Sequence, residues 1–220
     1  MADAVAYKAI LARKEGMTQM FDEKGRVIPV TVLKAGPCVV MQVKSKTSDG
    51  YDALQVGFLD QKAARLNKPQ RVEAEKRKVG AKKVVREIRL DGASERKVGE
   101  EIKCDVFAAG DVIDVIGINK GHGFQGVMSA WNFKHKARSR GNMNVRGPGS
   151  IGMRTWPGRV LRGKRMATHW GCEKITVKNL RVVAVQPEHD TLLVSGAVPG
   201  TDDGVVFVRT ARSVRKFSKA

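Results

Sequence analysis

The stretch KITVKNLRVVAVQ, residues 174–186, decides the fold class of this chain. Its first half alternates apolar with polar side chains, and its second half is rich in β-branched residues. Alternation places the apolar side chains on one face of a strand, and β-branched side chains fit a pleated, half-buried surface. The stretch therefore predicts a β-strand with one face in a core.

Further runs of the same kind recur along the chain. They are RVIPVTVL (26–33), CVVMQV (38–43), YDALQVGFL (51–59), KVVREIRL (83–90), DVIDVIGI (111–118), DTLLVSGAV (190–198) and GVVFVRT (204–210). Groups of turn-forming residues separate several of them, at 22–25, 48–50, 187–190 and 201–204. Many short strands separated by turns indicate a mainly antiparallel barrel or sandwich.

Helices are expected to be few. One is predicted over 69–79, with Pro69 at the first helical position, and a short one around 124–132. We therefore expect a mainly β, α+β fold.

The composition limits the class of protein. The chain has 220 residues, of which 42% are hydrophobic, so it is long enough to bury a core. Its longest apolar runs fall far short of the roughly 20 residues that span a bilayer. The first residues do not read as a secretory signal, and Cys38, Cys104 and Cys172 form no C-x-x-C pair. We expect a protein of the reducing cytoplasm without a membrane segment.

The net charge of +19 comes from two segments. Residues 61–90 hold 11 basic and 3 acidic side chains, and residues 115–172 hold 11 basic and no acidic ones. In the first segment, glutamates of EAEKRKVGAKK (73–83) can pair locally with lysines, which leaves a simple solvated face as an alternative. The second segment cannot balance its charge internally, so it predicts a polyanionic partner such as nucleic acid.

The acid-free segment also lacks regular periodicity. More than 50 residues separate the runs at 111–118 and 174–186, and irregular connections of this length are usually functional or disordered. Glycine lets a backbone approach a partner closely, arginine matches phosphates, and aromatic rings stack on bases. We expect the segment to be mobile without its partner. Trp131 is expected to pack in the core beside Phe124 and Phe133, and Trp156 is expected to remain outside it.

Several motifs resemble one known family, in the same order along nearly the whole chain. They are KAILARKEGMTQMFDEKGRVIPVTVLKAGPC (8–38), DGYDALQVGF (49–58), NKP (67–69), GVMSAWNF (126–133), GPGSIG (147–152), PGRVLRGKRMA (157–167), ITVKNLRVV (175–183) and LLVSGAVPG (192–200). Together they resemble the large-subunit ribosomal protein L-three family, bacterial type.

This resemblance implies a translation-protein type antiparallel β-barrel formed by 1–118 and 173–220, with 61–90 as a small basic, partly helical insertion. Residues 119–172 would form an extended loop that enters the large-subunit rRNA toward the peptidyl transferase centre. The family role is structural, not enzymatic, and includes early assembly near the 3′-end domain of the RNA. It implies neighbours of the L-fourteen and L-nineteen families, no homo-oligomer, no cofactor and no membrane.

The rRNA-binding residues expected from the acid-free segment are Lys120, Lys134, Lys136, Arg138, Arg140, Arg146, Arg154, Trp156, Arg159, Arg162, Lys164 and Arg165. A secondary basic surface is expected from Arg71, Lys76, Arg77, Lys78, Lys82 and Lys83. The family motifs place the loop tip near 153–156. Thr155 stands where many family members carry a glutamine that is methylated in some of them, so we expect no glutamine methylation there.

Other readings of the sequence compete with this one. GHGFQG (121–126) matches the G-x-G-x-x-G of a dinucleotide-binding oxidoreductase, but the first acidic residue after Asp114 is Glu173, so no ribose-binding carboxylate follows at the required spacing. His169 and Cys172 have the spacing of two zinc ligands without a second pair, so no metal site is predicted. A non-ribosomal nucleic-acid-binding protein or RNA chaperone remains an alternative.

Overall fold

The computed structural model describes residues 8–90, 92, 94 and 96–213. The chain divides into two units. The body comprises the residues up to Ile118 and from Lys174 onward, and the second unit comprises Asn119–Glu173. Each unit is described below by itself.

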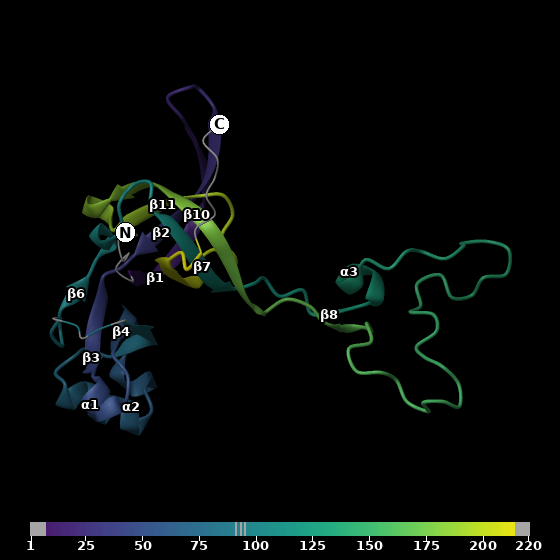
Figure 1. The fold of residues 1–220 in the computed structure, drawn as a ribbon, viewed down its shortest axis with the longest axis horizontal. Helices are drawn as coiled ribbons and strands as arrows, with labels where there is room; N and C mark the ends of the chain where they lie inside the picture. The colour runs from purple at the N-terminus through teal and green to yellow at the C-terminus, as the bar shows by residue number, and fades with distance from the viewer. Residues whose placement is uncertain (1–7, 91, 93, 95, 214–220) are drawn as a thin grey trace. The chain divides into compact units, whose positions relative to one another are not determined.

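The body is built on a closed barrel of six antiparallel strands in the order β1-β12-β7-β10-β11-β2 (Figure 1). The strands are β1 (Ala9–Phe21), β2 (Val27–Ala35), β7 (Val112–Ile118), β10 (Lys174–Gln186), β11 (Thr191–Ser195) and β12 (Val205–Thr210). This barrel confirms the predicted mainly β fold class.

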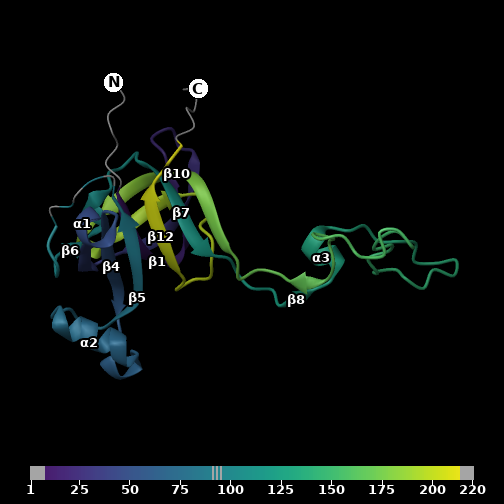
Figure 2. The same ribbon diagram turned by 60° about the horizontal axis from the view of Figure 1, so that its bottom comes forward.

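A second sheet of four strands, in the order β5-β4-β3-β6, completes the body. Its strands are β3 (Cys38–Lys44), β4 (Ala53–Asp60), β5 (Lys82–Arg89) and β6 (Glu101–Ile102). Helix α1 (Lys46–Asp49) connects β3 to β4, and η1 (Ala63–Arg65) and α2 (Lys68–Lys76) lie between β4 and β5 (Figure 2). Two further 3-10 turns are η2 (Cys104–Val106) and η3 (Pro187–His189).

One hydrophobic core serves both sheets of the body. Ile10 and Leu33 from the barrel and Val40 and Phe58 from the second sheet belong to the same buried cluster. Burial of an aliphatic or aromatic side chain of this size stabilises a fold by about 1.5–3 kcal/mol. The core of the body contains no residue of the second unit.

Strand β1 is a strand that the sequence pattern did not predict. Its first four residues, Ala9–Ala12, are all buried, so no apolar–polar alternation marks them. The pairing register between β1 and β2 also shifts between Lys14 and Gly16. A strand buried on both faces and interrupted by a bulge lacks the period of two by which strands are recognised.

The predicted helices exist with shorter bounds. Helix α2 ends at Lys76 instead of residue 79, and Pro69 is its second residue, after Asn67 as the N-cap. Helix α3 is confined to Val127–Trp131, because Phe124–Gln125 form the short strand β8. Among the described residues, no helix is long and apolar enough to cross a membrane.

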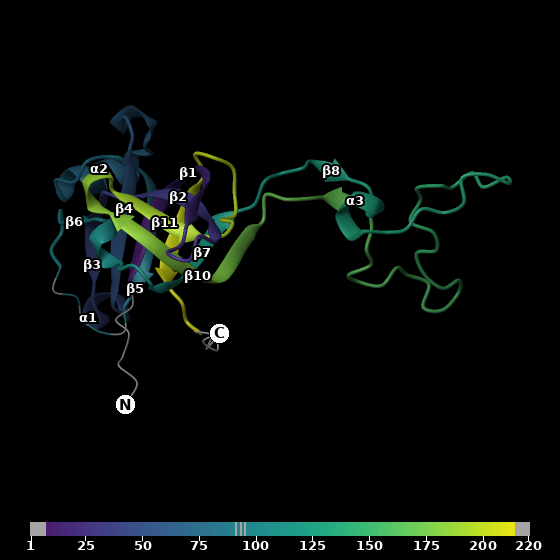
Figure 3. The same ribbon diagram turned by 90° about the horizontal axis from the view of Figure 1, so that it is seen from above.

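The second unit contains little regular structure. Strand β8 pairs with β9 (Thr168–His169), and α3 follows β8. Residues 132–167, all of which the structure describes, form no helix or strand (Figure 3).

Candidate nucleic-acid interface

The second unit begins and ends in a paired stem, which we define as residues 120–125 and 168–172. The backbone N–H of His122 donates to the carbonyl of Trp170 at 2.8 Å, and the N–H of Trp170 donates to Gly123 at 2.9 Å. The rings of His122 and Trp170 stack with 4.2 Å between their centres. Phe124 meets His169 edge to face at 5.6 Å. The outgoing and returning chains are therefore held together before the irregular loop begins.

Two glycines permit this close approach. A Cβ atom on Gly171 would overlap with the carbonyl oxygen of Lys120, and Gly171 also has a φ of +85°. A Cβ atom on Gly121 would lie 2.5 Å from the sulfur of Cys172. A side chain at Gly171 would push the two chains of the stem apart because it meets backbone atoms, whereas one at Gly121 would displace the Cys172 side chain.

Trp131 does not pack in a hydrophobic core, and the prediction that it does is wrong. Its side chain is 39% exposed and that of Phe124 is 67% exposed. The reason is that residues 119–173 contain one buried hydrophobic side chain, Val127, and thus have no core to receive an indole. Trp131 instead donates from Nε1 to the carbonyl of Met166 at 2.8 Å, and its ring lies 5.5 Å from the guanidinium of Arg165.

Trp131 therefore links the helix α3 to the returning chain, and Arg165 gains a cation–π contact. Both contacts hold the start of the irregular segment 132–167 close to its end.

The cations predicted to bind rRNA are all exposed. They are Lys120, Lys134, Lys136, Arg138, Arg140, Arg146, Arg154, Arg159, Arg162, Lys164 and Arg165. None of them forms an ion pair with a carboxylate that the structure describes. Repulsion among these charges is therefore relieved only by solvent ions or by an anionic partner.

Residues 153–156, which the family motifs place at the loop tip, also expose large apolar side chains. Trp156 is 84% exposed and Met153 is 74% exposed, so Trp156 lies outside any core, as the sequence predicts. Local hydrogen bonds are sparse here; one runs from the hydroxyl of Ser150 to the carbonyl of Gly152 at 3.1 Å. Exposed apolar side chains among unpaired cations are typical of a surface that contacts a partner.

Comparison with known proteins identifies the family. The family model for ribosomal protein L3 matches residues 59–191. The chain belongs to the ribosomal protein L3 family.

Two relatives show how far the L3 similarity extends. The large ribosomal subunit protein uL3 of Syntrophobacter fumaroxidans is 46% identical over 202 residues, which cover 92% of this chain and 96% of the relative. The uL3 protein of Syntrophotalea carbinolica is 48% identical over 208 residues, covering 94% of this chain and 99% of the relative. Membership of the L3 family confirms the resemblance seen in the sequence and supports a structural role in the large ribosomal subunit.

The secondary basic surface is partly neutralised within this L3 chain. Arg71 forms an ion pair with Glu75 at 3.9 Å, Arg77 pairs with Glu73, and Lys82 pairs with Asp60 at 2.7 Å. The glutamates of 73–83 thus pair with arginines instead of the expected lysines.

Lys76, Lys78 and Lys83 make no ion pair with the described carboxylates. About half of the predicted surface therefore keeps its full positive charge.

The motif GHGFQG does not form a dinucleotide site in this L3 family member. Its Phe124–Gln125 pair belongs to β8, which is antiparallel to β9, and the pairings in the barrel and the second sheet are antiparallel as well. A dinucleotide site needs a parallel βαβ unit with a phosphate at a helix N-terminus. Within the described part of the chain, no group of three or more His, Cys, Asp or Glu side chains is placed to hold a metal ion.

Proposed function

We propose that this chain binds large-subunit rRNA through residues 119–172 and helps to organise that RNA early in subunit assembly. The observation that supports this proposal is the set of 11 exposed cations of the second unit, none of which pairs with a described carboxylate. Phosphodiester groups would supply the missing negative charge, and release of their counterions would favour binding.

The residues near the expected loop tip indicate how the loop would contact the RNA. Trp156 would stack on a base or wedge between bases, and Arg154 and Arg159 would bind nearby phosphates, because guanidinium groups match phosphate oxygens with two parallel hydrogen bonds. Ordering of residues 132–167 would then occur on binding. In the intact subunit this tip would approach the peptidyl transferase centre. The RNA partner would include the 3′-end domain, and the protein neighbours would belong to the L-fourteen and L-nineteen families of cytoplasmic ribosomes.

The salt dependence of RNA binding tests this proposal. The variant Arg154→Gln/Arg159→Gln/Arg162→Gln is compared with Lys24→Gln/Arg26→Gln/Lys34→Gln, which loses the same charge from exposed positions of the body. Each lost phosphate contact reduces the log–log slope of affinity against salt by roughly 0.7–0.9. We expect a flatter slope for the loop variant only, measured with a 3′-domain fragment of the rRNA. Equal slopes for both variants would refute the assignment of the loop.

A second measurement separates the ribosomal role from that of a free RNA chaperone. On a sucrose gradient at high salt, a structural subunit protein sediments with the large subunit. A loosely bound chaperone is released to the top of the gradient.

A further inference from the structure

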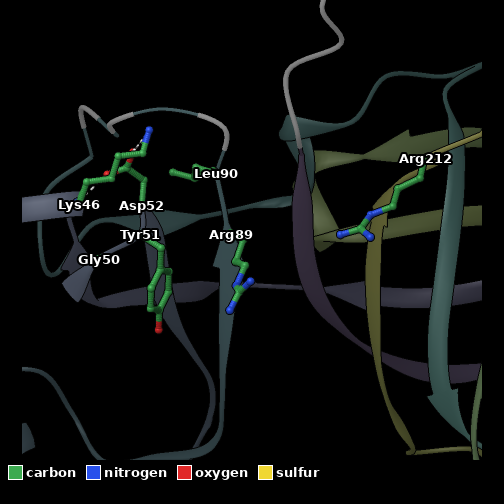
Figure 4. Close-up of a pocket in the computed structure, with 7 residues that line it drawn as sticks. All are labelled: Lys46, Gly50, Tyr51, Asp52, Arg89, Leu90 and Arg212. Atoms are coloured by element: carbon green, nitrogen blue, oxygen red, sulfur yellow. Dashed lines mark hydrogen bonds and ion pairs between the residues drawn. The ribbon is translucent and has the colours of Figure 1, made fainter.

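A hollow of about 620 Å³ lies in the body, and none of the loop cations lines it (Figure 4). It is lined by Tyr51 and Asp52 before β4, Arg89 and Leu90 at the end of β5, Lys46 of α1, and Arg212 after β12. A volume of this size falls within the roughly 300–1,000 Å³ of small-molecule sites.

Two guanidinium groups at this hollow have no described acidic partner. Neither Arg89 nor Arg212 forms an ion pair with a carboxylate in the part of the chain that the structure describes. Figure 4 shows Arg89 beside Tyr51, and Arg212 on a separate segment at the right, with its guanidinium group directed toward them. Because both groups line the same hollow, both can attract an anion that is bound there.

Two described carboxylates, Asp52 in the lining and Glu87 in contact with Tyr51, are already matched by other cations. Glu87 forms an ion pair with Lys44 at 2.8 Å and accepts a hydrogen bond from the Tyr51 hydroxyl at 2.8 Å. Asp52 accepts from the backbone N–H of Lys46 at 3.0 Å and pairs with the Lys46 ammonium at 3.6 Å. The charges of Glu87 and Asp52 are thus used in local structure, whereas no described carboxylate pairs with Arg89 or Arg212.

An aromatic ring and an apolar side chain accompany these arginines. The guanidinium carbon of Arg89 lies 4.9 Å from the centre of the Tyr51 ring, and Lys44 Nζ lies 5.2 Å from the same centre. The Tyr51 hydroxyl is fixed by Glu87 and by Lys44, whose Nζ donates to it at 2.9 Å. A fixed stack of this kind offers a flat surface for a base next to a charged group for a phosphate.

We propose that this hollow is a second RNA site, which holds one unpaired nucleotide of the rRNA. Its phosphate lies between Arg89 and Arg212, and its base lies against the Arg89–Tyr51 stack and Leu90. The flat stack favours a nucleotide over an acidic peptide, because a carboxylate side chain has no ring to place there. This inference rests on the proposed function and adds a contact on the body to the contacts of the loop.

The test uses full-length chains and a matched control. Arg89→Gln/Arg212→Gln removes the two guanidinium groups of the hollow. Arg86→Gln/Arg181→Gln removes two exposed arginines of the same unit that do not line the hollow and form no ion pair with described carboxylates. With the 3′-domain rRNA fragment, we expect the hollow variant to bind at least about tenfold more weakly than the control, because it loses two charge-assisted contacts; tenfold corresponds to about 1.4 kcal/mol. Matching thermal melts would show that both variants remain folded.

The side-chain Nε–Hε resonances of Arg89 and Arg212 identify the ligand. We expect hexauridylate to shift them at concentrations that leave Arg86 and Arg181 unchanged. A shift with inorganic phosphate and none with hexauridylate would mean a site for free anions, and a shift with polyglutamate alone would mean a protein partner. Either result would overturn the inference.

Failure of this inference is distinct from failure of the proposed function. If the unsubstituted chain binds rRNA and both double variants bind it equally, only the second site is refuted. If the unsubstituted chain does not bind rRNA, both proposals are refuted.

Discussion

Trp170 stacks on His122, and the backbone amides of both residues donate hydrogen bonds across the same pair of chains. This stem holds together the two ends of a loop that has almost no core of its own. Aromatic stacking contributes about 0.5–1.5 kcal/mol beyond simple burial, so the stem is a main source of order in the second unit.

The variant Gly171→Ala should open the stem. A methyl group at this position overlaps with the carbonyl of Lys120, and the φ of +85° is unfavourable for alanine. We expect faster amide hydrogen exchange at His122 and Trp170. The matched control is Gly126→Ala, because Gly126 has an ordinary φ of −70° and open space around its Cβ position. Unchanged exchange in Gly171→Ala would show that the stem tolerates the added methyl group.

Lys14→Met should destabilise the body. Lys14 is 6% exposed, and its Nζ donates to the carbonyls of Val198 at 3.2 Å and Gly200 at 3.3 Å. Methionine keeps most of the side-chain volume but leaves these carbonyls without their donor. We expect a loss of about 1–3 kcal/mol in the free energy of unfolding by urea. Lys34→Met, at an exposed position of β2, should change this free energy little. A similar value for both variants would argue against a structural role of the Lys14 hydrogen bonds.

The sequence predicted the strands that are rich in β-branched or large apolar residues between turn-forming groups, including the almost fully buried β11. Strand β10 has the bounds of the run 174–186, in which Lys174 and Lys178 are exposed and Val182 is buried. Strand β1 was missed because its buried start, Ala9–Ala12, has a single β-branched residue and no apolar–polar alternation. Trp131 was misplaced because residue type alone does not reveal that residues 119–173 lack a core.

The two candidate sites also differ in whether the sequence alone could predict them. The exposed loop cations were predictable, because an acid-free segment contains no partner for them. The hollow lined by Arg89 and Arg212 could not be predicted, because these arginines are far apart in the sequence. Only the folding of β5 and β12 brings them to one cavity.

The ion pair between Lys44 and Glu87 should make part of the stability of the second sheet depend on acid pH. The hydrogen bond from Lys44, and secondly that from Tyr51, lowers the pKa of Glu87 below its ordinary value of 4.5. The interaction therefore stabilises the folded state above the ordinary pKa, and this stabilisation is lost as the pH falls through the lowered folded-state pKa. We expect Lys44→Met to raise the midpoint of the Glu87 carboxyl ¹³C titration toward 4.5, and Tyr51→Phe to raise it less. Lys34→Met should leave the midpoint unchanged. An unchanged midpoint in Lys44→Met would contradict this account.

The three cysteines should react with N-ethylmaleimide at very different rates. Cys172 is exposed, whereas Cys38 and Cys104 are buried. Burial also raises the pKa of Cys38 to about 11 and raises that of Cys104, which keeps both as unreactive thiols at neutral pH. We expect mass spectrometry after brief labelling at pH 7.5 to find one adduct, on Cys172, and three adducts in urea. Early labelling of Cys38 would mean that the core opens more readily than its burial indicates.

Replacement of residues 135–165 by a short Gly-Ser linker should leave the body folded. The hydrophobic core of the body lies entirely outside residues 119–173, so the deletion removes none of its buried contacts. The variant also retains both Trp131 and Met166, whose hydrogen bond joins the two chains next to the stem, so the stem can still close. We expect a circular-dichroism melting temperature within a few degrees of that of the unsubstituted chain, together with defective assembly or peptidyl transfer in ribosomes that contain the variant. The variant Leu33→Ala is the opposite control: it truncates a fully buried core side chain and should lower the melting temperature markedly while leaving every loop cation in place. If the deletion abolished the melting transition of the body, the loop would be part of the folding unit, and the division between a self-sufficient body and an RNA-dependent loop would be wrong.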